Sequence, residues 1–199
     1  VARKLCRFVP QAGTFDPQIE WRKTEYSIEP EKNEIAMTPA VADLDSDGIP
    51  DIIFVARGPG SDYDAMHHGI VRAVRGSDGQ ELWSVPDHLL NAYCGIAVGD
   101  IDNDSNPEII AVHESTVLIA FEHDGSLKWI SSHVNNDVGR GAPSLADLDE
   151  DGSPEIVIGA TVLNSDGTLR WHQRSGSGDI GRGPLSIIAD LDLDGSPEI

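Results

Sequence analysis

The chain has few cysteines, few basic residues and no long apolar run. Its only cysteines are Cys6 and Cys94, so a disulfide-dense scaffold is excluded, and one bridge or two unpaired thiols remain equally open. No apolar stretch approaches the roughly 20 residues that a transmembrane helix needs. The start of the chain, Val1 to Cys6, lacks the apolar core of a signal peptide. We therefore expect no membrane span in this segment, and any export signal to have been removed or to lie outside it.

Positive charge is also scarce. The 199 residues contain 34 acidic and 14 basic side chains, which gives a formal net charge of −20. This charge repels nucleic-acid phosphates and anionic membrane surfaces, so neither is an expected partner. About half of the acidic residues fall in four short segments. Clustered carboxylates repel one another unless a cation lies among them, so this distribution points to bound metal ions.

The four acidic segments are copies of one pattern, D-x-D-x-D-x-x-P-[DE], at residues 43–51, 100–108, 147–155 and 190–198. A second pattern recurs in phase with it, an Asp-Gly pair followed by tryptophan four residues after the glycine. Trp21, the one tryptophan outside this pattern, is expected to end an earlier unit. Two markers in a fixed order are typical of a repeat protein. The copies of the second pattern are Asp78-Gly79 with Trp83, Asp124-Gly125 with Trp129, and Asp166-Gly167 with Trp171.

Short runs rich in β-branched residues separate these markers, and no stretch has helical periodicity. The Asp-Gly pairs are typical of hairpin turns, because glycine accepts a positive φ. Each unit of roughly 40 to 45 residues therefore gives about four antiparallel strands, which predicts an all-β fold, a β-propeller with sequence for about four blades. The predicted domain, or fragment of one, spans 1–199, with units at roughly 22–83, 84–129, 130–171 and an incomplete 172–199, and an insertion loop at 57–69.

Calcium prefers six to eight hard oxygen ligands in a flexible geometry, and each acidic segment offers such a set. Positions 1, 3 and 5 are aspartates, position 7 can contribute its backbone carbonyl, and position 9 is a further carboxylate that we rank below the aspartates. Glycine at position 6 permits a sharp bend, so the second segment, with Ser105 there, is expected to bind more weakly. The predicted Ca²⁺ ligands are Asp43, Asp45, Asp47, Ile49, Asp51, Asp100, Asp102, Asp104, Asn106, Glu108, Asp147, Asp149, Asp151, Ser153, Glu155, Asp190, Asp192, Asp194, Ser196 and Glu198.

Other interpretations of the acidic segments are weaker. One copy alone would be read as a hydrophilic turn, but four phased copies argue against it. An EF-hand is excluded because its loop continues to a glutamate at position 12 between two helices. Calcium-binding β-rolls repeat a nonapeptide without long intervals, and are excluded too. Within the insertion, His67 and His68 beside Asp62 and Asp64 allow a transition-metal site or, as we favour, a solvated surface loop.

The acidic segments resemble those of the FG-GAP/VCBS repeat family, which includes the N-terminal β-propellers of integrin α subunits and propellers of many secreted bacterial proteins. The resemblance extends over nearly the whole chain. It implies that each acidic loop joins neighbouring strands of a blade and holds Ca²⁺, and that the complete propeller has about seven blades. It also implies an extracellular, cell-surface or periplasmic location. The glycine-alanine-proline signature of the family is kept at Gly141-Ala142-Pro143, whereas other copies read Met37-Thr38-Pro39 and Gly183-Pro184.

Propellers serve binding and catalysis alike, so the fold does not decide the function. The chain has no G-x-S-x-G, zinc or phosphate-loop motif. We therefore predict a calcium-binding module for a carbohydrate, matrix or protein ligand, with no catalytic residues. The alternatives are a spacer in a large surface protein and a calcium-dependent polysaccharide lyase, since propeller-type rhamnogalacturonan lyases resemble this chain. For a lyase, Arg140 and Arg182 are the candidate cationic groups, although their recurrence favours a structural role.

Overall fold

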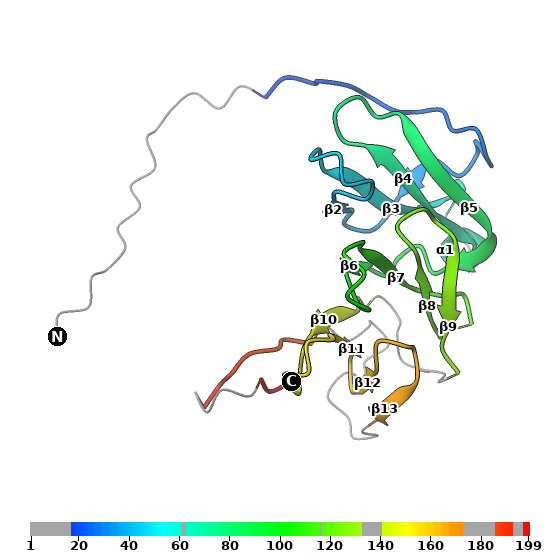
Figure 1. The fold of residues 1–199 in the computed structure, drawn as a ribbon. Helices are drawn as coiled ribbons and strands as arrows, with labels where there is room; N and C mark the ends of the chain where they lie inside the picture. The colour runs from blue at the N-terminus through cyan, green and yellow to red at the C-terminus, as the bar shows by residue number, and fades with distance from the viewer. Residues whose placement is uncertain (1–16, 61–62, 116, 133–140, 173–185, 193–196) are drawn as a thin grey trace.

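The computed structural model describes residues 17–60, 63–115, 117–132, 141–172, 186–192 and 197–199. In this part of the chain nearly all regular structure is β-strand, in three antiparallel sheets that follow one another in sequence (Figure 1). The predicted all-β class is therefore confirmed. The residues named in the sequence analysis that lie outside the described ranges are Val1, Cys6, Asp62, Arg140, Arg182, Gly183, Pro184, Asp194 and Ser196.

We name the sheets A, B and C in chain order. Sheet A has the order β1-β3-β4-β5, and β2 also pairs with β3; sheets B and C each have four strands in sequential order. The strands of sheet A are β1 (Glu34–Ile35), β2 (Ala40–Ala42), β3 (Asp51–Arg57), β4 (Gly69–Arg75) and β5 (Glu81–Leu90). The strands of sheet B are β6 (Ala97–Gly99), β7 (Glu108–Val112), β8 (Leu118–Phe121) and β9 (Leu127–Ile130). The strands of sheet C are β10 (Ser144–Ala146), β11 (Glu155–Ile158), β12 (Thr161–Leu163) and β13 (Leu169–His172).

The last hairpin of every sheet contains the same irregularity, a β-bulge one residue before tryptophan. In sheet B, Ala120 is opposite Trp129 and Phe121 is opposite Leu127, so the intervening Lys128 has no partner residue in the ladder. The bulge residue is Leu82 in sheet A and Arg170 in sheet C. A bulge turns its side chain away from the regular alternation, and in these sheets the turned residues differ in charge.

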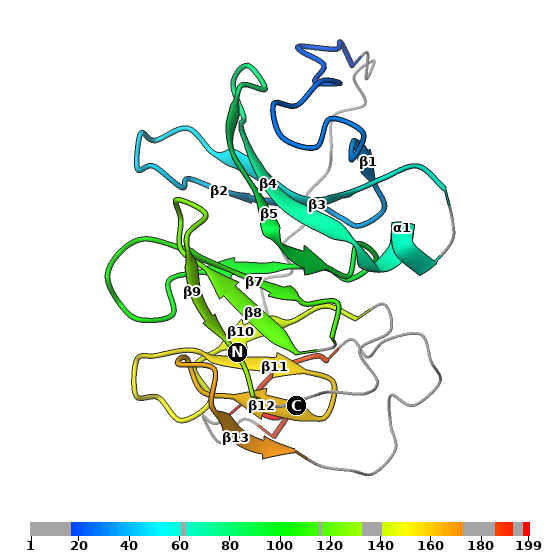
Figure 2. The ribbon, with the colours of Figure 1, turned by 90° about the vertical axis from the view of Figure 1, so that its right-hand side faces the viewer.

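The sheets stack on one another, as Figure 2 shows, and the core lies between them. Alternate residues of β7 point to opposite sides: Ile109 packs with residues of sheet A, and Ile110 packs with residues of sheet C. Because both faces of sheet B are buried, its central strands β7 and β8 read as continuous apolar runs rather than an alternating pattern. The first strands also meet, since β6 contacts both β2 and β10.

Each Asp-Gly turn is packed against a tryptophan from the preceding unit. The indole Nε1 of Trp83 in sheet A donates to the His123 carbonyl of the turn in sheet B, at 3.0 Å, and Trp129 donates to the Ser165 carbonyl of the turn in sheet C, also at 3.0 Å. Trp21 donates in the same way to the Gly76 carbonyl in sheet A, at 2.8 Å. Trp21 therefore has the same relation to sheet A that Trp83 has to sheet B.

The outer face of sheet A carries a buried arginine. Arg72 of β4 is 0% exposed, and its Nη2 donates to the backbone carbonyls of Ile28, Glu29 and Lys32 at 2.7, 2.9 and 3.1 Å. Its guanidinium also lies 4.4 Å from the centroid of the Tyr26 ring. These contacts attach the segment before β1 to the sheet. Burial lowers the pKa of Arg72 from its ordinary value, yet an arginine stays charged at any physiological pH.

The insertion between β3 and β4 contains a helical turn that the sequence analysis did not predict. This helix, α1 (Tyr63–His67), buries only Ala65. A turn of this length is too short to produce a readable helical period. No helix among the described residues is long and apolar enough to cross a bilayer.

Candidate metal centres

Each acidic segment forms a loop between the first two strands of a unit. Loop 1 connects β2 to β3, loop 2 connects β6 to β7, and loop 3 connects β10 to β11. Loop 4 lies between Ala189 and Glu198, which form an isolated antiparallel bridge. Loops 2 and 3 contact each other, because Asn103 Nδ2 donates to Ser153 Oγ at 3.3 Å. The short strands thus place the acidic loops in the same position in successive sheets.

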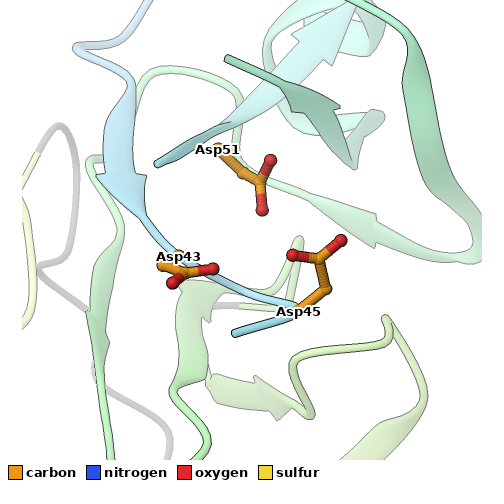
Figure 3. A group of neighbouring side chains, drawn as sticks. All are labelled: Asp43, Asp45 and Asp51. Carbon is orange, nitrogen blue, oxygen red and sulfur yellow. The ribbon is translucent and has the colours of Figure 1, made fainter. Parts of the chain in front are cut away.

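The carboxylates at positions 1, 3 and 9 converge in every loop. In loop 1, Asp43 and Asp45 approach from the end of β2, and Asp51 approaches from the start of β3 (Figure 3). One oxygen from each member of a group lies within 4.8 Å of the others. The groups are Asp43, Asp45 and Asp51; Asp100, Asp102 and Glu108; Asp147, Asp149 and Glu155; and Asp190, Asp192 and Glu198.

The carboxylates at position 5 of loops 1 to 3 do not join those at positions 1 and 3. Asp47 and Asp151 are in none of the groups found among the described residues, whereas Asp104 groups with Glu108 and Glu122. In each of loops 1 to 3 the position 5 Oδ1 accepts a hydrogen bond from the backbone N–H of position 7, as from Ile49 in loop 1 at 2.7 Å. The structure therefore brings position 9 together with positions 1 and 3, although the sequence analysis had ranked position 9 lower.

A shared set of backbone hydrogen bonds holds the loops in shape. In loop 1 the two oxygens of Asp43 accept from the N–H groups of Asp47 and Gly48, at 3.1 and 2.9 Å. Asp51 Oδ2 accepts from the N–H of Leu44 at 3.1 Å, which closes the loop. Loops 2 and 3 repeat all three bonds, and loop 4 repeats the closing bond, from Leu191 to Glu198 at 2.7 Å. The carboxylates are thus oriented by the backbone itself.

This loop conformation requires positive φ at two positions. Position 4 has φ values of +59° to +64° at Ser46, Asn103 and Glu150, and position 6 has +83° at Gly48, +74° at Ser105 and +91° at Gly152. The sequence pointed to position 6 through its glycines. It gave no signal at position 4, because serine and glutamate have no preference for the left-handed region.

Ser105→Gly is expected to stabilise the protein by about 0.5–1 kcal/mol, because glycine adopts a φ of +74° without the steric cost that serine bears. The reciprocal change Gly152→Ser, at a φ of +91°, should destabilise it by a similar amount. Urea unfolding with a chelator present measures both effects without a contribution from bound metal. An unchanged or lower stability of Ser105→Gly would show that position 6 is not strained in loop 2.

The position 9 carboxylates of loops 1 to 3 are buried, with exposed fractions of 1% for Asp51, 0% for Glu108 and 4% for Glu155, whereas Glu198 of loop 4 is partly exposed. Burial raises the pKa of Asp51, and the neighbouring charges of Asp45 and Asp43 raise it further, against the lowering effect of the Leu44 N–H. Burial also raises the pKa of Glu108, against the lowering effects of the Ile101 N–H and Lys128. A buried carboxylate among other carboxylates is costly unless a cation compensates it.

Two basic side chains, which the sequence analysis missed, reach loops 2 and 3 from the bulges of β9 and β13. Lys128 Nζ lies 2.7 Å from Asp102 Oδ2, 3.3 Å from Glu108 Oε1 and 3.0 Å from Glu122 Oε1. Although burial alone would lower it, the hydrogen bonds that the ammonium donates to these carboxylates hold the pKa of Lys128 above its ordinary value. The available signal was a basic residue directly before tryptophan in two of the units.

Arg170 makes the corresponding contacts in loop 3. Its Nη2 lies 2.7 Å from Asp149 Oδ2, and its Nη1 lies 2.5 Å from Glu155 Oε1. Lys128 and Arg170 therefore bridge positions 3 and 9 of loops 2 and 3, respectively. Their chemical difference does not change the pairing, since each places one positive charge between the same two carboxylates.

The histidines of the insertion do not form a metal group with the described residues. His67 stacks on Tyr63, with ring centroids 4.1 Å apart. His68 Nε2 faces Glu114 at 3.4 Å, and its Nδ1 faces Asp64 at 3.8 Å. The groups of three or more potential ligands in the described ranges include neither histidine.

The thiol of Cys94 is buried just before β6, and burial raises its pKa to about 12. Cys94 is in none of the groups of potential metal ligands found among the described residues. The converging groups of the acidic loops contain carboxylates alone. This donor chemistry fits a hard cation such as Ca²⁺ better than a metal that prefers nitrogen or sulfur.

Three solved structures are similar to the chain in fold. The V. cholerae biofilm matrix protein Bap1 matches with a TM-score of 0.55 and 22% identity, over 90% of this chain and 37% of that one. The rhamnogalacturonan lyase YesW matches with a TM-score of 0.51 and 22% identity, over 67% and 30% of the two chains. The exotype rhamnogalacturonan lyase YesX matches with a TM-score of 0.53 and 18% identity, over 80% and 33%. This chain therefore spans about a third of the length of each of these proteins.

Sequence comparison adds a family but no individual relative. No curated protein sequence matches the chain. The family model described as FG-GAP-like repeat matches residues 100–158, a range that begins at loop 2, contains loop 3 and ends with β11. The matched range contains two of the acidic segments on which the sequence analysis based its resemblance to this family.

Proposed function

We propose that the chain is part of a calcium-binding β-propeller that serves as an extracellular or cell-surface binding module for a polysaccharide or matrix component. The observation that carries the proposal is the convergence of three carboxylates in each of four equivalent loops. Their oxygens are fixed by backbone N–H groups, so the repulsion between them is built into the fold and a divalent cation would relieve it. The propeller assignment is supported by the stacking of successive four-stranded units with their first strands in contact.

The binding role is supported by the solved structures whose fold is similar to this chain. Bap1 is a biofilm matrix protein, and YesW and YesX are rhamnogalacturonan lyases. One of these names refers to a matrix and two refer to a polysaccharide, which supports a ligand of either class for this chain. Calcium at the concentrations found outside cells suits loops built from hard oxygen ligands. We assign no catalytic residue, because the acidic clusters of the described residues consist of loop carboxylates together with Glu122, which pairs with Lys128.

Calcium is expected to stabilise the protein, since a ligand that binds only the folded state shifts the unfolding equilibrium. At a free concentration of ten times the dissociation constant, each occupied site contributes about 1.4 kcal/mol. Thermal unfolding in calcium and in chelator measures the effect. Asp45→Asn should reduce it, whereas Asp87→Asn, which changes an exposed carboxylate of β5 outside the loops, should not. Coincident unfolding curves, together with no metal retained after dialysis, would contradict calcium binding.

The ligand class is tested by incubating the protein with pectic and other acidic polysaccharides in calcium. We expect binding on a glycan array without new absorbance from unsaturated uronates. Absorbance that appears with the protein and is lost in Arg140→Ala or Arg182→Ala would replace the binding module by a lyase. Absence of binding to every glycan, with calcium still bound, would overturn the proposed ligand class and leave the metal assignment intact.

A further inference from the structure

The three loops whose sheets are described differ in the charge of one equivalent residue. The bulge before tryptophan holds Leu82 in sheet A, Lys128 in sheet B and Arg170 in sheet C. The bulge turns this residue toward the acidic loop of its own sheet in both B and C, where Lys128 and Arg170 make their ion pairs. The fold therefore provides a fixed position for a cation, and the sequence fills it in two of three cases.

In loops 2 and 3 this cation pairs with the one oxygen of the position 9 carboxylate that accepts no hydrogen bond from the backbone. Glu108 Oε2 accepts from the N–H of Ile101 at 2.8 Å, and Oε1 pairs with Lys128. Glu155 Oε2 accepts from the N–H of Leu148 at 2.8 Å, and Oε1 pairs with Arg170. Both loops thus show directly that the space between positions 3 and 9 accepts a positive charge.

Loop 1 has the same carboxylates but no such partner within the described residues. Leu82 packs against the apolar core instead. Asp51 accepts one hydrogen bond, from Leu44, and neither Asp51 nor Asp45 takes part in an ion pair in the described part of the chain. Arg75 is opposite Asp51 in the ladder, but its Nη1 faces Gln80 at 2.8 Å and Asp78 at 3.4 Å. The negative charge of loop 1 is therefore left to an external cation.

We propose that Lys128 and Arg170 act as tethered cations that weaken calcium binding in loops 2 and 3, and that loop 1 is consequently the tightest calcium site of the three. This inference rests on the proposed calcium binding and adds an order of affinities to it. If the residue at position 6 alone set the calcium affinities, loop 3, which has Gly152 there, would bind calcium as tightly as loop 1. With tethered cations, loop 3 is weakened as loop 2 is.

Calorimetric titration with calcium tests the order, on the whole chain carrying Asp192→Asn throughout so that loop 4 does not contribute a site. The tightest site should disappear in Asp45→Asn and persist in Asp149→Asn. Leu82→Lys should weaken the tightest site by on the order of tenfold, since it introduces a charge at close range, while Leu82→Gln, which makes the same loss of packing without the charge, should leave it near the wild-type affinity. Lys128→Gln and Arg170→Gln should each strengthen one weaker site by a similar factor, and Lys128→Arg should not.

The outcomes separate this inference from the function on which it rests. No calcium binding by the wild-type protein would overturn both. Calcium binding with the tightest site lost in Asp149→Asn rather than Asp45→Asn would overturn the inference alone. Equal affinities for Leu82→Lys and Leu82→Gln, with Lys128→Gln and Arg170→Gln unchanged from wild type, would also overturn it while the proposed function stands. Circular dichroism of each variant in chelator shows which variants are folded, and Lys128→Gln and Arg170→Gln test the inference even if Leu82→Lys does not fold.

Discussion

Arg72→Met is expected to lower the free energy of unfolding by roughly 3–5 kcal/mol, the cost of removing one partner from a buried charge network. Methionine keeps the bulk of the side chain but leaves the carbonyls of Ile28, Glu29 and Lys32 without their shared donor. It also removes the cation facing the Tyr26 ring and Glu81, which lies 3.5 Å from Nη1. Urea unfolding in chelator measures the change. Hydrogen exchange should show that residues 26–32 lose protection first.

Two substitutions serve as controls, one at Arg75, another arginine of β4, and one at Arg72 itself. Arg75→Met, on the same strand but at a partly exposed position, should cost less than about 1 kcal/mol. Arg72→Lys keeps the charge without the planar set of donors, so it should fall between the wild type and Arg72→Met. A cost for Arg72→Met no greater than that for Arg75→Met would mean that the segment before β1 is held by its other contacts.

Gly167→Ala is expected to cost about 2–5 kcal/mol through two additive effects. Gly167 has a φ of +80°, which penalises any side chain, and a Cβ there would lie 2.7 Å from Cε3 of Trp129. The ring cannot move freely, because its Nε1 donates to the Ser165 carbonyl of the same turn. Thermal or urea unfolding measures the loss, and tryptophan fluorescence should report a changed environment of Trp129.

Gly48→Ala separates the two effects, because Gly48 has a φ of +83° but nothing within 4 Å of a Cβ. Its cost in chelator, about 1–2 kcal/mol, gives the backbone share alone. Combining Gly167→Ala with Trp129→Leu should cost less than the sum of the single changes, since the smaller side chain makes room for the methyl group. Equal costs for Gly48→Ala and Gly167→Ala would show that the turn and the indole are not in tight contact.

The acidic loops were predictable because their ligands are contiguous in sequence. Positions 1, 3 and 9 come from one segment of nine residues, so spacing alone brings Asp43 and Asp51 into one loop. The strands and the Asp-Gly turns were predictable for the same reason, since β-branched runs and hairpin glycines act locally. What depends on one segment at a time could be read from the sequence.

Features that depend on the meeting of distant segments could not be predicted in this way. Lys128 is 26 residues from Asp102 and reaches it only because a bulge in β9 changes the direction of its side chain. Glu108 is fully buried and pairs with Lys128, which lies 20 residues later in the chain. Arg72 stands within a mostly apolar strand, and the carbonyls that it binds lie at least 40 residues earlier in the chain.

The tryptophan contacts link each unit only to the next one. Trp21 meets the turn of sheet A, Trp83 that of sheet B and Trp129 that of sheet C. The core clusters follow the same rule, because one joins A to B, another joins B to C, and none found among the described residues joins A to C. Such a chain of nearest-neighbour couplings behaves as a one-dimensional array, in which a defect at one junction divides the array into blocks on either side. A lesion in the turn at Gly167 would thus release sheet C while sheets A and B continued to melt as a pair.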